Sequence, residues 1–352
     1  MTINVDAEGY VTGFEVGKRS YRELQHPPLS YSLAKSVLWC PEDAWRISQR
    51  RERVERETSD AMDDGNILDS LLTAPEMVTS ASRLLAADLS TGQKSAAIQT
   101  WTAPTKKPTD PVEYLDWNGL RIILAESLQT KAAKEAAADA RENDLTPVLA
   151  AKFEREVRKA NEMLVRFELA GFDRSKYMYQ VSLYWAETAR NGRRIQCRGR
   201  LDFLSHDWTS IVDLKRVEDL SERSLQSAVD RYRWAMQAAA YSRAVVHLHA
   251  EGMLDHLLGG TGQAYSLSNA VSNVPTWEWL FARTSPVVAC TLRPIDARLL
   301  QAGEAAWNRA VNEWAEGLQT GLWRGHESNH MPIEITAWAE EQRTIDLIGD
   351  PA

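Results

Sequence analysis

Apolar and polar residues change their spacing near the middle of the chain, from a helical pattern to one typical of strands. Residues 178–187 alternate between apolar and polar side chains, as a half-buried strand does. The dipeptide Asn191-Gly192 predicts a tight hairpin turn after them. Residues 195–205 and 209–217 have the composition of two further strands. This part of the chain therefore predicts three consecutive strands joined by short connections.

Helical patterns are found on both sides of these strands. The helix that follows is predicted over residues 221–250, with one apolar stripe made by Leu225, Val229, Tyr232 and Met236. The remaining predicted elements are, in chain order, two short helices within residues 26–52, a helix over 62–73, a long helical region over 119–169 that is interrupted near Pro147, a loop over 257–275, a strand over 286–292 and a helix over 296–318.

This order of elements predicts an α/β fold with a central mixed sheet flanked by helices and a largely helical N-terminal part. The 352 residues suffice for one large domain, which we expect over residues 28–326, after an N-terminal segment (1–27) and before an acidic C-terminal tail (327–352). No apolar run is long enough to span a membrane, and the N-terminus lacks a signal pattern, so we expect a cytoplasmic protein.

Charge and cysteine content narrow the possible functions. The three cysteines are far apart, which argues against a disulfide framework, a zinc ribbon or an iron–sulfur cluster. The net charge of −8 argues against a nucleic-acid partner, but residues 190–233 hold ten Lys/Arg against seven Asp/Glu, a local balance of about +3. A basic rim around an acidic metal site would suit an enzyme that cuts DNA. A solvated surface of mixed charge explains the same counts equally well.

The residues that suggest chemistry are Asp202, Asp213 and Lys215. Residues two apart in a strand point to the same face, so Asp213 and Lys215 share a side, and the short connection brings Asp202 beside them. Carboxylate oxygens bind Mg²⁺, and the backbone carbonyl of Leu214 offers a further hard ligand. A lysine can orient or deprotonate the attacking water. The competing interpretation is a simple Asp–Lys ion pair on a strand.

The helix after these strands offers residues that could contact DNA. Gln237 and Tyr241 are four apart and share a helix face, and Arg233 lies one turn earlier. Such a face could hold a DNA strand by phosphate contact and stacking. Tyr232 and Arg200 are further candidates for DNA contact. The alternative is a polar helix face whose tyrosine packs on the sheet.

These segments resemble the RecE-like exonucleases of phages and prophages, which belong to the PD-(D/E)XK nuclease superfamily together with lambda exonuclease and the RecB nuclease domain. The resemblance is carried by GRLDFL (199–204), IVDLK (211–215) and MQAAAY (236–241). Further similar segments appear in the same order: LSYSLAKSVLWCPEDAW (29–45), GNILDSLLTAPE (65–76), TKAAKEAAADARENDLTPVL (130–149), WLFARTSPVVACTL (279–292) and GLWRG (321–325). The resemblance covers most of residues 28–326, with a catalytic core at about 177–250.

The resemblance implies a Mg²⁺-dependent exodeoxyribonuclease, with Mn²⁺ as the alternative metal. Such an enzyme degrades linear double-stranded DNA from its ends in the 5′-to-3′ direction and leaves a single strand for homologous recombination. It implies a ring-like homo-oligomer, a single-strand annealing protein as partner, and the cytoplasm of a bacterial host or a prophage origin. Asp69, Asp202 and Asp213 would bind metal, Lys215 would assist the water, and Gln237, Tyr232 and Tyr241 would shape the DNA site.

Two positions depart from the family's pattern. Asp69 stands where a metal-binding histidine is usual; an aspartate is a suitable Mg²⁺ ligand, or it is simply an exposed helix residue. Gln180 stands where a glutamate is frequent and brings no negative charge. Either activity is weaker for that reason, or this position does not contact the metal. Two other functions therefore compete: a structure-specific or nicking endonuclease, and a non-catalytic DNA-binding protein on the same fold.

Overall fold

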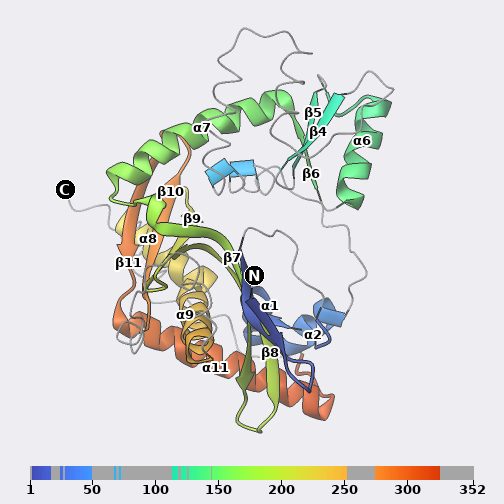
Figure 1. Ribbon diagram of the computed structural model, residues 1–352, viewed down its shortest axis with the longest axis vertical. Helices are drawn as coiled ribbons and strands as arrows, with labels where there is room; N and C mark the ends of the chain where they lie inside the picture. Colours follow the sequence, from blue (N-terminus) through green and yellow to red (C-terminus); the bar gives the residue numbers. More distant parts are fainter. Residues whose placement is uncertain are drawn as a thin grey trace, which may run out of the picture.

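The protein has a mixed α/β fold around a central, mostly antiparallel sheet with helices on both faces (Figure 1). This confirms the predicted α/β class. The computed structural model describes residues 2–16, 24–26, 28–49, 67–68, 71–72, 113–117, 120–124, 127–143, 145–251 and 274–325. No helix within these ranges combines the length and the apolar character that crossing a bilayer requires.

The central sheet is built around the three strands that the alternation pattern predicts. Its strand order is β1 (Thr2–Val5), β2 (Val11–Val16), β7 (Tyr177–Thr188), β8 (Arg194–Ser205), β9 (Ser210–Arg216), β10 (Thr276–Arg283) and β11 (Ala289–Pro294). Neighbours on this path are antiparallel except β9 and β10, which are parallel. The short β3 (Leu29–Ser30) pairs parallel with β8. The predicted strand–strand–strand segment is therefore confirmed, as antiparallel neighbours at the centre of the sheet.

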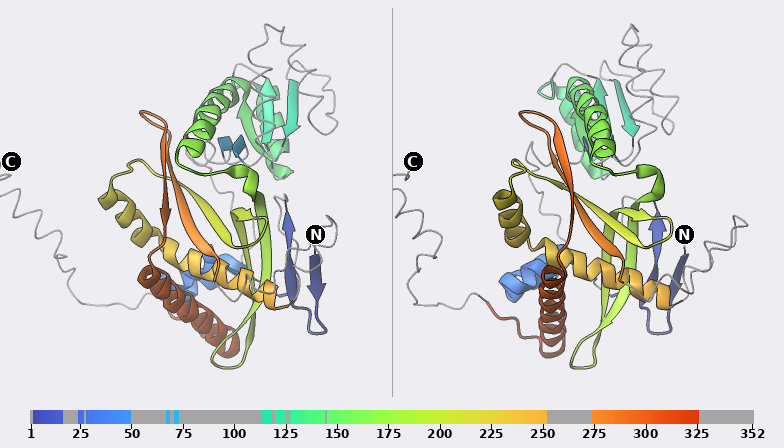
Figure 2. Two further views of the ribbon diagram at one scale, coloured as in Figure 1. Left: turned by 60° about the vertical axis from the view of Figure 1, so that its left-hand side comes forward. Right: turned by 90° about the vertical axis from the view of Figure 1, so that its left-hand side faces the viewer.

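Each face of the sheet covers its own hydrophobic core. The first core, which includes Trp185, Trp307 and Trp314, lies under α1, α8, α9 and α11. The second core, which includes Phe167 and Phe203, lies under α7 and the helical residues 67–68 and 71–72. Figure 2 shows α9 and α11 together on one side of the sheet. The bounds of these helices and of α2 are Tyr31–Trp39 (α1), Pro41–Gln49 (α2), Ala150–Leu169 (α7), Glu222–Tyr232 (α8), Trp234–Ala250 (α9) and Ala297–Thr320 (α11).

A smaller sheet lies at the α7 end of the molecule (Figure 1). It consists of β4 (Glu113–Trp117), β5 (Leu120–Leu124) and β6 (Thr146–Leu149), next to α6 (Lys131–Glu142). Leu120, Ile122 and Val148 join the second core, and β5 and β6 contact α7. The predicted helical region over 119–169 is wrong for β5 and β6: branched apolar side chains in both strands pack well in a sheet. Only α6 and α7 are helical there.

Several other elements differ from those predicted. The N-terminal hairpin β1–β2 and the strand β10 were not predicted, and β11 begins three residues after the predicted start at residue 286. The helix predicted over 221–250 is broken at Arg233, whose φ of 56° is left-handed and separates α8 from α9. The apolar stripe predicted along this helix is therefore not continuous. Leu225, Val229 and Met236 are buried, whereas Tyr232, beside the break, is 43% exposed. The predicted N- and C-terminal boundaries stay predictions, and the tail over 327–352 lies outside the described residues.

The cysteines give a simple test of this fold. All three are free, with Cys40 and Cys197 buried and Cys290 partly buried. Burial raises the pKa of the Cys197 thiol well above its usual range and that of Cys290 to about 11. We therefore expect the native protein to react slowly with a thiol reagent such as DTNB at pH 8, and all three thiols to react once guanidinium unfolds the chain. Rapid native reaction of any thiol would contradict the packing described here.

Candidate active site

Three neighbouring strands bring Gln180, Asp202 and Asp213 into one row across the sheet. The β7–β8 ladder pairs the residues on either side of Gln180 and Asp202 but skips this pair. The β8–β9 ladder ends with Phe203 and Val212, one position before Asp202 would face Asp213. The regular hydrogen bonding of the sheet is thus interrupted at the row that carries the two aspartates.

The backbone at this row is strained and the strands change their orientation. Gln180 has a φ of 49°, a left-handed conformation that costs free energy in any residue other than glycine. On one side of the row Tyr179 and Phe203 contact the second core, whereas Val181 and Leu201 on the other side belong to the first core. In a regular strand, residues two apart would face the same core. The two strands therefore switch faces where the acidic residues lie.

The side chain of Asp202 fills the gap in the hydrogen-bond ladder. Its Oδ2 accepts a hydrogen bond of 2.9 Å from the backbone N–H of Leu214. A carboxylate that accepts a backbone N–H is held in a fixed position and its charged form is stabilised. This contact ties β8 to β9 beside Asp213.

Asp213, Lys215 and Gln237 form a closed network. The Nζ atom of Lys215 lies 2.5 Å from Oδ2 of Asp213. It also donates a hydrogen bond of 2.9 Å to Oε1 of Gln237. The Nε2 atom of Gln237 donates to Oδ1 of Asp213 over 3.2 Å. Since Gln237 projects from α9, the helix fixes the relative positions of the acid and the base on β9.

The carboxyl group of Asp213 is an unusual position for a negative charge, because Asp213 is only 1% exposed. Burial raises the pKa of its carboxyl group, although the ammonium of Lys215 and a hydrogen bond with Asp202 act in the opposite direction. A buried carboxylate is stable only where cations and hydrogen-bond donors compensate it. The ammonium of Lys215, in contact with Oδ2 of Asp213, provides part of this compensation.

These residues line one pocket of about 450 Å³. Seven of the residues singled out from the sequence belong to it, together with Leu68 and Arg216, which were not. The seven are Gln180, Arg200, Asp202, Asp213, Leu214, Lys215 and Gln237. Arg200 is held by Ser182, whose Oγ accepts from its Nε over 3.3 Å. The structure thus brings together an acidic pair, a lysine and two arginines.

The donors in the pocket suit a hard divalent cation. Two carboxylates, the amide oxygen of Gln180 and the carbonyl of Leu214 are oxygen ligands of the kind that Mg²⁺ and Mn²⁺ prefer, with water in the remaining positions. Within the described ranges, no group of three His, Cys, Asp or Glu side chains is arranged to hold a metal ion. The expected third acid, Asp69, lies outside the described residues, next to Leu68 in the sequence.

Three residues expected to contact DNA lie outside this pocket. Tyr241 is 6% exposed, and its ring packs against Trp185 and Trp277 with centroids 6.4 and 6.3 Å apart. It also covers Gly199 so closely that a Cβ atom there would come within 2.3 Å of the ring. A ring buried in this way is not available for a base to stack on, and the alternative, a tyrosine packed on the sheet, describes its position; DNA contact by Tyr241 stays a prediction. Tyr232 is on the neighbouring surface, and Arg233 links α8 to α9.

Tyr31 and Trp234 also lie beside the network and were not predicted from the sequence. The hydroxyl of Tyr31 donates to the backbone carbonyl of Tyr232. Burial and the nearby charge of Asp213 raise the pKa of Tyr31, and Arg233 opposes them, so the start of α1 lies near the acids. The ring centroid of Trp234 is 5.3 Å from Nζ of Lys215. Tyr31 is too distant in sequence to be linked to the strands by any local pattern.

Comparisons with known proteins give little further information. The sequence matches no known protein family and no curated protein. Among solved structures it is similar to a candidate exonuclease from Eubacterium rectale, with 13% identity over 92% of this chain and 94% of that chain and a TM-score of 0.45. A likeness at this level establishes neither the fold nor the function of this chain. The resemblance to RecE-like exonucleases therefore stays a prediction.

Proposed function

We propose that this chain is a Mg²⁺-dependent exonuclease that degrades linear double-stranded DNA, with a PD-(D/E)XK type of active centre. The observation that supports the proposal is the meeting of Asp202, Asp213, Lys215 and Gln237 in one pocket, at an interruption of the sheet. Strain and a buried charge of this kind reduce stability and are typical of functional sites. Mn²⁺ is the alternative metal.

Each residue has a distinct part in this proposal. Asp202, Asp213 and the carbonyl of Leu214 would hold the metal, which supplies positive charge against the scissile phosphate and lowers the pKa of a bound water. Lys215 orients the attacking water through its ammonium group and stabilises the negative charge that develops on the phosphate oxygens. Gln237 keeps the side chains of Lys215 and Asp213 in a fixed relative position through its hydrogen bonds with both. These contacts keep the lysine beside the acid before any substrate arrives.

Phosphate binding in this proposal comes from the two arginines of the pocket. Arg200 and Arg216 line it from β8 and from the end of β9. A guanidinium group can donate two parallel hydrogen bonds to a phosphate, which fixes its orientation as well as its position. The 5′-to-3′ direction, the homo-oligomer, the single-strand annealing partner and the cytoplasm of a bacterial cell are further parts of the proposal, and they rest on the resemblance alone.

One experiment tests the proposed activity. Purified protein is incubated with end-labelled linear duplex or with a covalently closed circle of the same sequence, in Mg²⁺ or in EDTA. Stepwise shortening of the linear duplex in Mg²⁺ alone, with the circle intact, is the expected result. Metal-dependent cutting of the circle would contradict the exonuclease hypothesis and favour an endonuclease that uses the same site. If neither substrate is lost in a metal-dependent way, both enzyme hypotheses are refuted and a non-catalytic DNA-binding protein is favoured.

A substitution at Gln180 tests the ligand set. Gln180 lines the pocket but brings no charge, so Gln180→Glu adds a carboxylate beside Asp202. We expect the concentration of Mg²⁺ that gives half-maximal cleavage to fall about three- to tenfold, because each added carboxylate strengthens binding of a hard cation. The measurement is the initial rate over a series of Mg²⁺ concentrations, with Gln226→Glu on the exposed face of α8 as a matched control. An unchanged Mg²⁺ requirement would place Gln180 outside the ligand set.

A further inference from the structure

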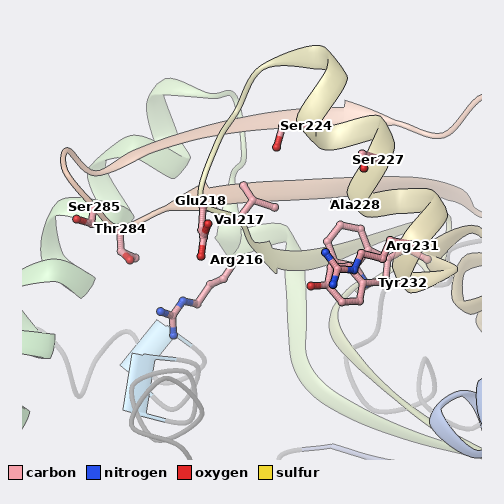
Figure 3. A pocket seen from close by; sticks show the side chains of 11 residues that line it. Arg216, Val217, Glu218, Ser224, Ser227, Ala228, Arg231, Tyr232, Thr284 and Ser285 are labelled. Carbon is pink, nitrogen blue, oxygen red and sulfur yellow. The ribbon is translucent and has the colours of Figure 1, made fainter. Parts of the chain in front are cut away.

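A second, larger concavity lies next to the pocket. Its volume is about 900 Å³, and it is formed by the end of β9, the helix α8 and the turn between β10 and β11 (Figure 3). We call it the α8 groove and define it by Arg216, Ser224, Arg231, Tyr232 and Ser285, which represent these three elements. Figure 3 shows Arg216 at the end of β9 and Tyr232 with Arg231 at the end of α8.

The α8 groove adjoins the active-site pocket. Arg216 lines both of them. Trp234 lines the groove, and its ring centroid is 5.3 Å from Nζ of Lys215, which lines the pocket. One tryptophan side chain thus separates the catalytic lysine from the groove. A polymer whose cleaved bond lies in the pocket would reach the groove by passing Arg216 and Trp234.

The wall of the groove carries a stack of aromatic and cationic groups. The rings of Tyr232 and Trp234 are stacked with centroids 5.3 Å apart and an angle of 24° between their planes. The guanidinium of Arg231 lies 5.7 Å from the centroid of the Tyr232 ring. Tyr232 is 43% exposed, whereas Trp234 is 9% exposed and supports it from below. An exposed ring on a rigid aromatic support is a platform on which a nucleic-acid base can stack.

The other groups of the groove match a sugar–phosphate backbone. The charged side chains that line the groove are two arginines, Arg216 and Arg231, and one carboxylate, Glu218. The groove therefore has an excess of positive charge, although the net charge of the whole chain is −8. The hydroxyl groups of Ser224, Ser227, Thr284 and Ser285 offer hydrogen bonds to phosphate and sugar oxygens. The lining thus combines polar groups with aromatic rings, as contact with both phosphates and bases requires.

We propose that the α8 groove binds a single DNA strand next to the cleavage site, with Tyr232 as the stacking platform. This inference rests on the proposed nuclease function. An unpaired strand is favoured over a duplex because the faces of bases in a duplex are covered by their neighbours, and only an unpaired base can lie flat on Tyr232. Arg216 and Arg231 would contact phosphates on either side of that base.

The test measures binding without cleavage. A fluorescein-labelled single strand of mixed sequence is titrated with protein in EDTA, and binding is followed by fluorescence anisotropy. We expect Tyr232→Ala to weaken binding about tenfold or more, since stacking on an aromatic side chain contributes strongly per base. Tyr232→Phe should bind like the wild type, because stacking needs the ring and not the hydroxyl. Trp39→Ala is the matched control, as Trp39 is 77% exposed and lines neither the pocket nor the groove.

A second variant and the salt dependence separate a direct contact from a structural effect. Tyr232→Leu keeps apolar packing on Trp234 without a flat ring, so it should bind as weakly as Tyr232→Ala while the melting temperature stays near that of the wild type. Removing Arg216 or Arg231 should reduce the slope of log affinity against log salt by about 0.7 for each arginine. Arg298→Ala, whose side chain is 93% exposed elsewhere, should leave this slope unchanged.

Failure of this proposal can be distinguished from failure of the nuclease proposal. Wild-type affinity in the folded Tyr232→Ala and Tyr232→Leu variants would overturn the proposal for the groove, as would equal or tighter binding of a blunt duplex of the same length. Both results leave metal-dependent cleavage intact. Absence of cleavage in Mg²⁺ would refute the nuclease but would not change the binding measured in EDTA.

Discussion

Replacement of Asp213 by asparagine is expected to lower the rate of Mg²⁺-dependent DNA cleavage by at least about 1,000-fold, because it removes a carboxylate that the proposed function makes a direct metal ligand. Asparagine has nearly the same shape, and its side-chain oxygen can still accept the hydrogen bond that Gln237 donates to Oδ1. The pocket should therefore keep its form while losing the charge that would bind the cation in the proposed function. The measurement is the initial rate of release of labelled nucleotide from linear duplex at saturating Mg²⁺.

The matched control for this variant is Asp173→Asn. Asp173 is an exposed aspartate at the start of the short helical turn Arg174–Lys176, and it lines neither the pocket nor the groove. We expect its cleavage rate to stay within about twofold of the wild type, since exposed substitutions far from a site have small effects. Cleavage by Asp213→Asn at more than a tenth of the wild-type rate would remove Asp213 from the metal site.

The second large effect is on stability, at Glu187 in the first core. One oxygen of Glu187 accepts hydrogen bonds of 3.1 Å from the indole N–H groups of Trp185 and Trp307. The other oxygen accepts 2.6 Å from Arg243, on α9. This carboxylate thereby joins β7, α9 and α11. Glu187→Ala leaves two buried N–H groups and one arginine without their partner, which should cost about 3 to 5 kcal/mol of the free energy of unfolding.

Urea unfolding followed by tryptophan fluorescence checks this effect. Glu135→Ala serves as the control, because its ion pair with Lys131 on α6 is exposed and spans 3.9 Å. Such surface pairs contribute about 0 to 1 kcal/mol, so the control should unfold close to the wild type. Glu187→Gln keeps an acceptor for the indoles and should fall between the two. If Glu187→Ala unfolds at the wild-type urea concentration, the carboxylate does not join these elements.

Much of the site follows from local sequence because its residues are close along the chain. Asp213 and Lys215 are alternate residues of one strand, and the short turn after Ser205 brings Asp202 back beside them. Gln237 is on the helix that packs over these strands, and the structure places it between the acid and the lysine. Strand periodicity and a short connection were therefore sufficient to predict Asp202, Asp213, Leu214 and Lys215, whereas Gln237 came from helix spacing and Gln180 from the family resemblance.

Other features depend on contacts that no local pattern shows. Gln237 and Tyr241 share a helix face, but α9 is buried on most of its sides, so a shared face did not mean shared exposure to DNA. The strand β10 pairs with β9 across a long intervening segment. The left-handed backbone at Gln180 is set by the two strands around it. In each case tertiary packing overrides the local preference of the chain.

Whether a divalent cation lies between Asp202 and Asp213 is tested most directly by iron-mediated cleavage of the polypeptide itself. Fe²⁺ replaces Mg²⁺ at oxygen-ligand sites and, with ascorbate and peroxide, cuts the backbone next to where it is bound. The predicted result is a small set of cuts in β8 and β9 near residues 202 and 213, which excess Mg²⁺ suppresses and which the double variant Asp202→Asn/Asp213→Asn lacks. Cuts confined to other segments, or cuts near these residues that persist in the double variant, would contradict a metal site in this pocket.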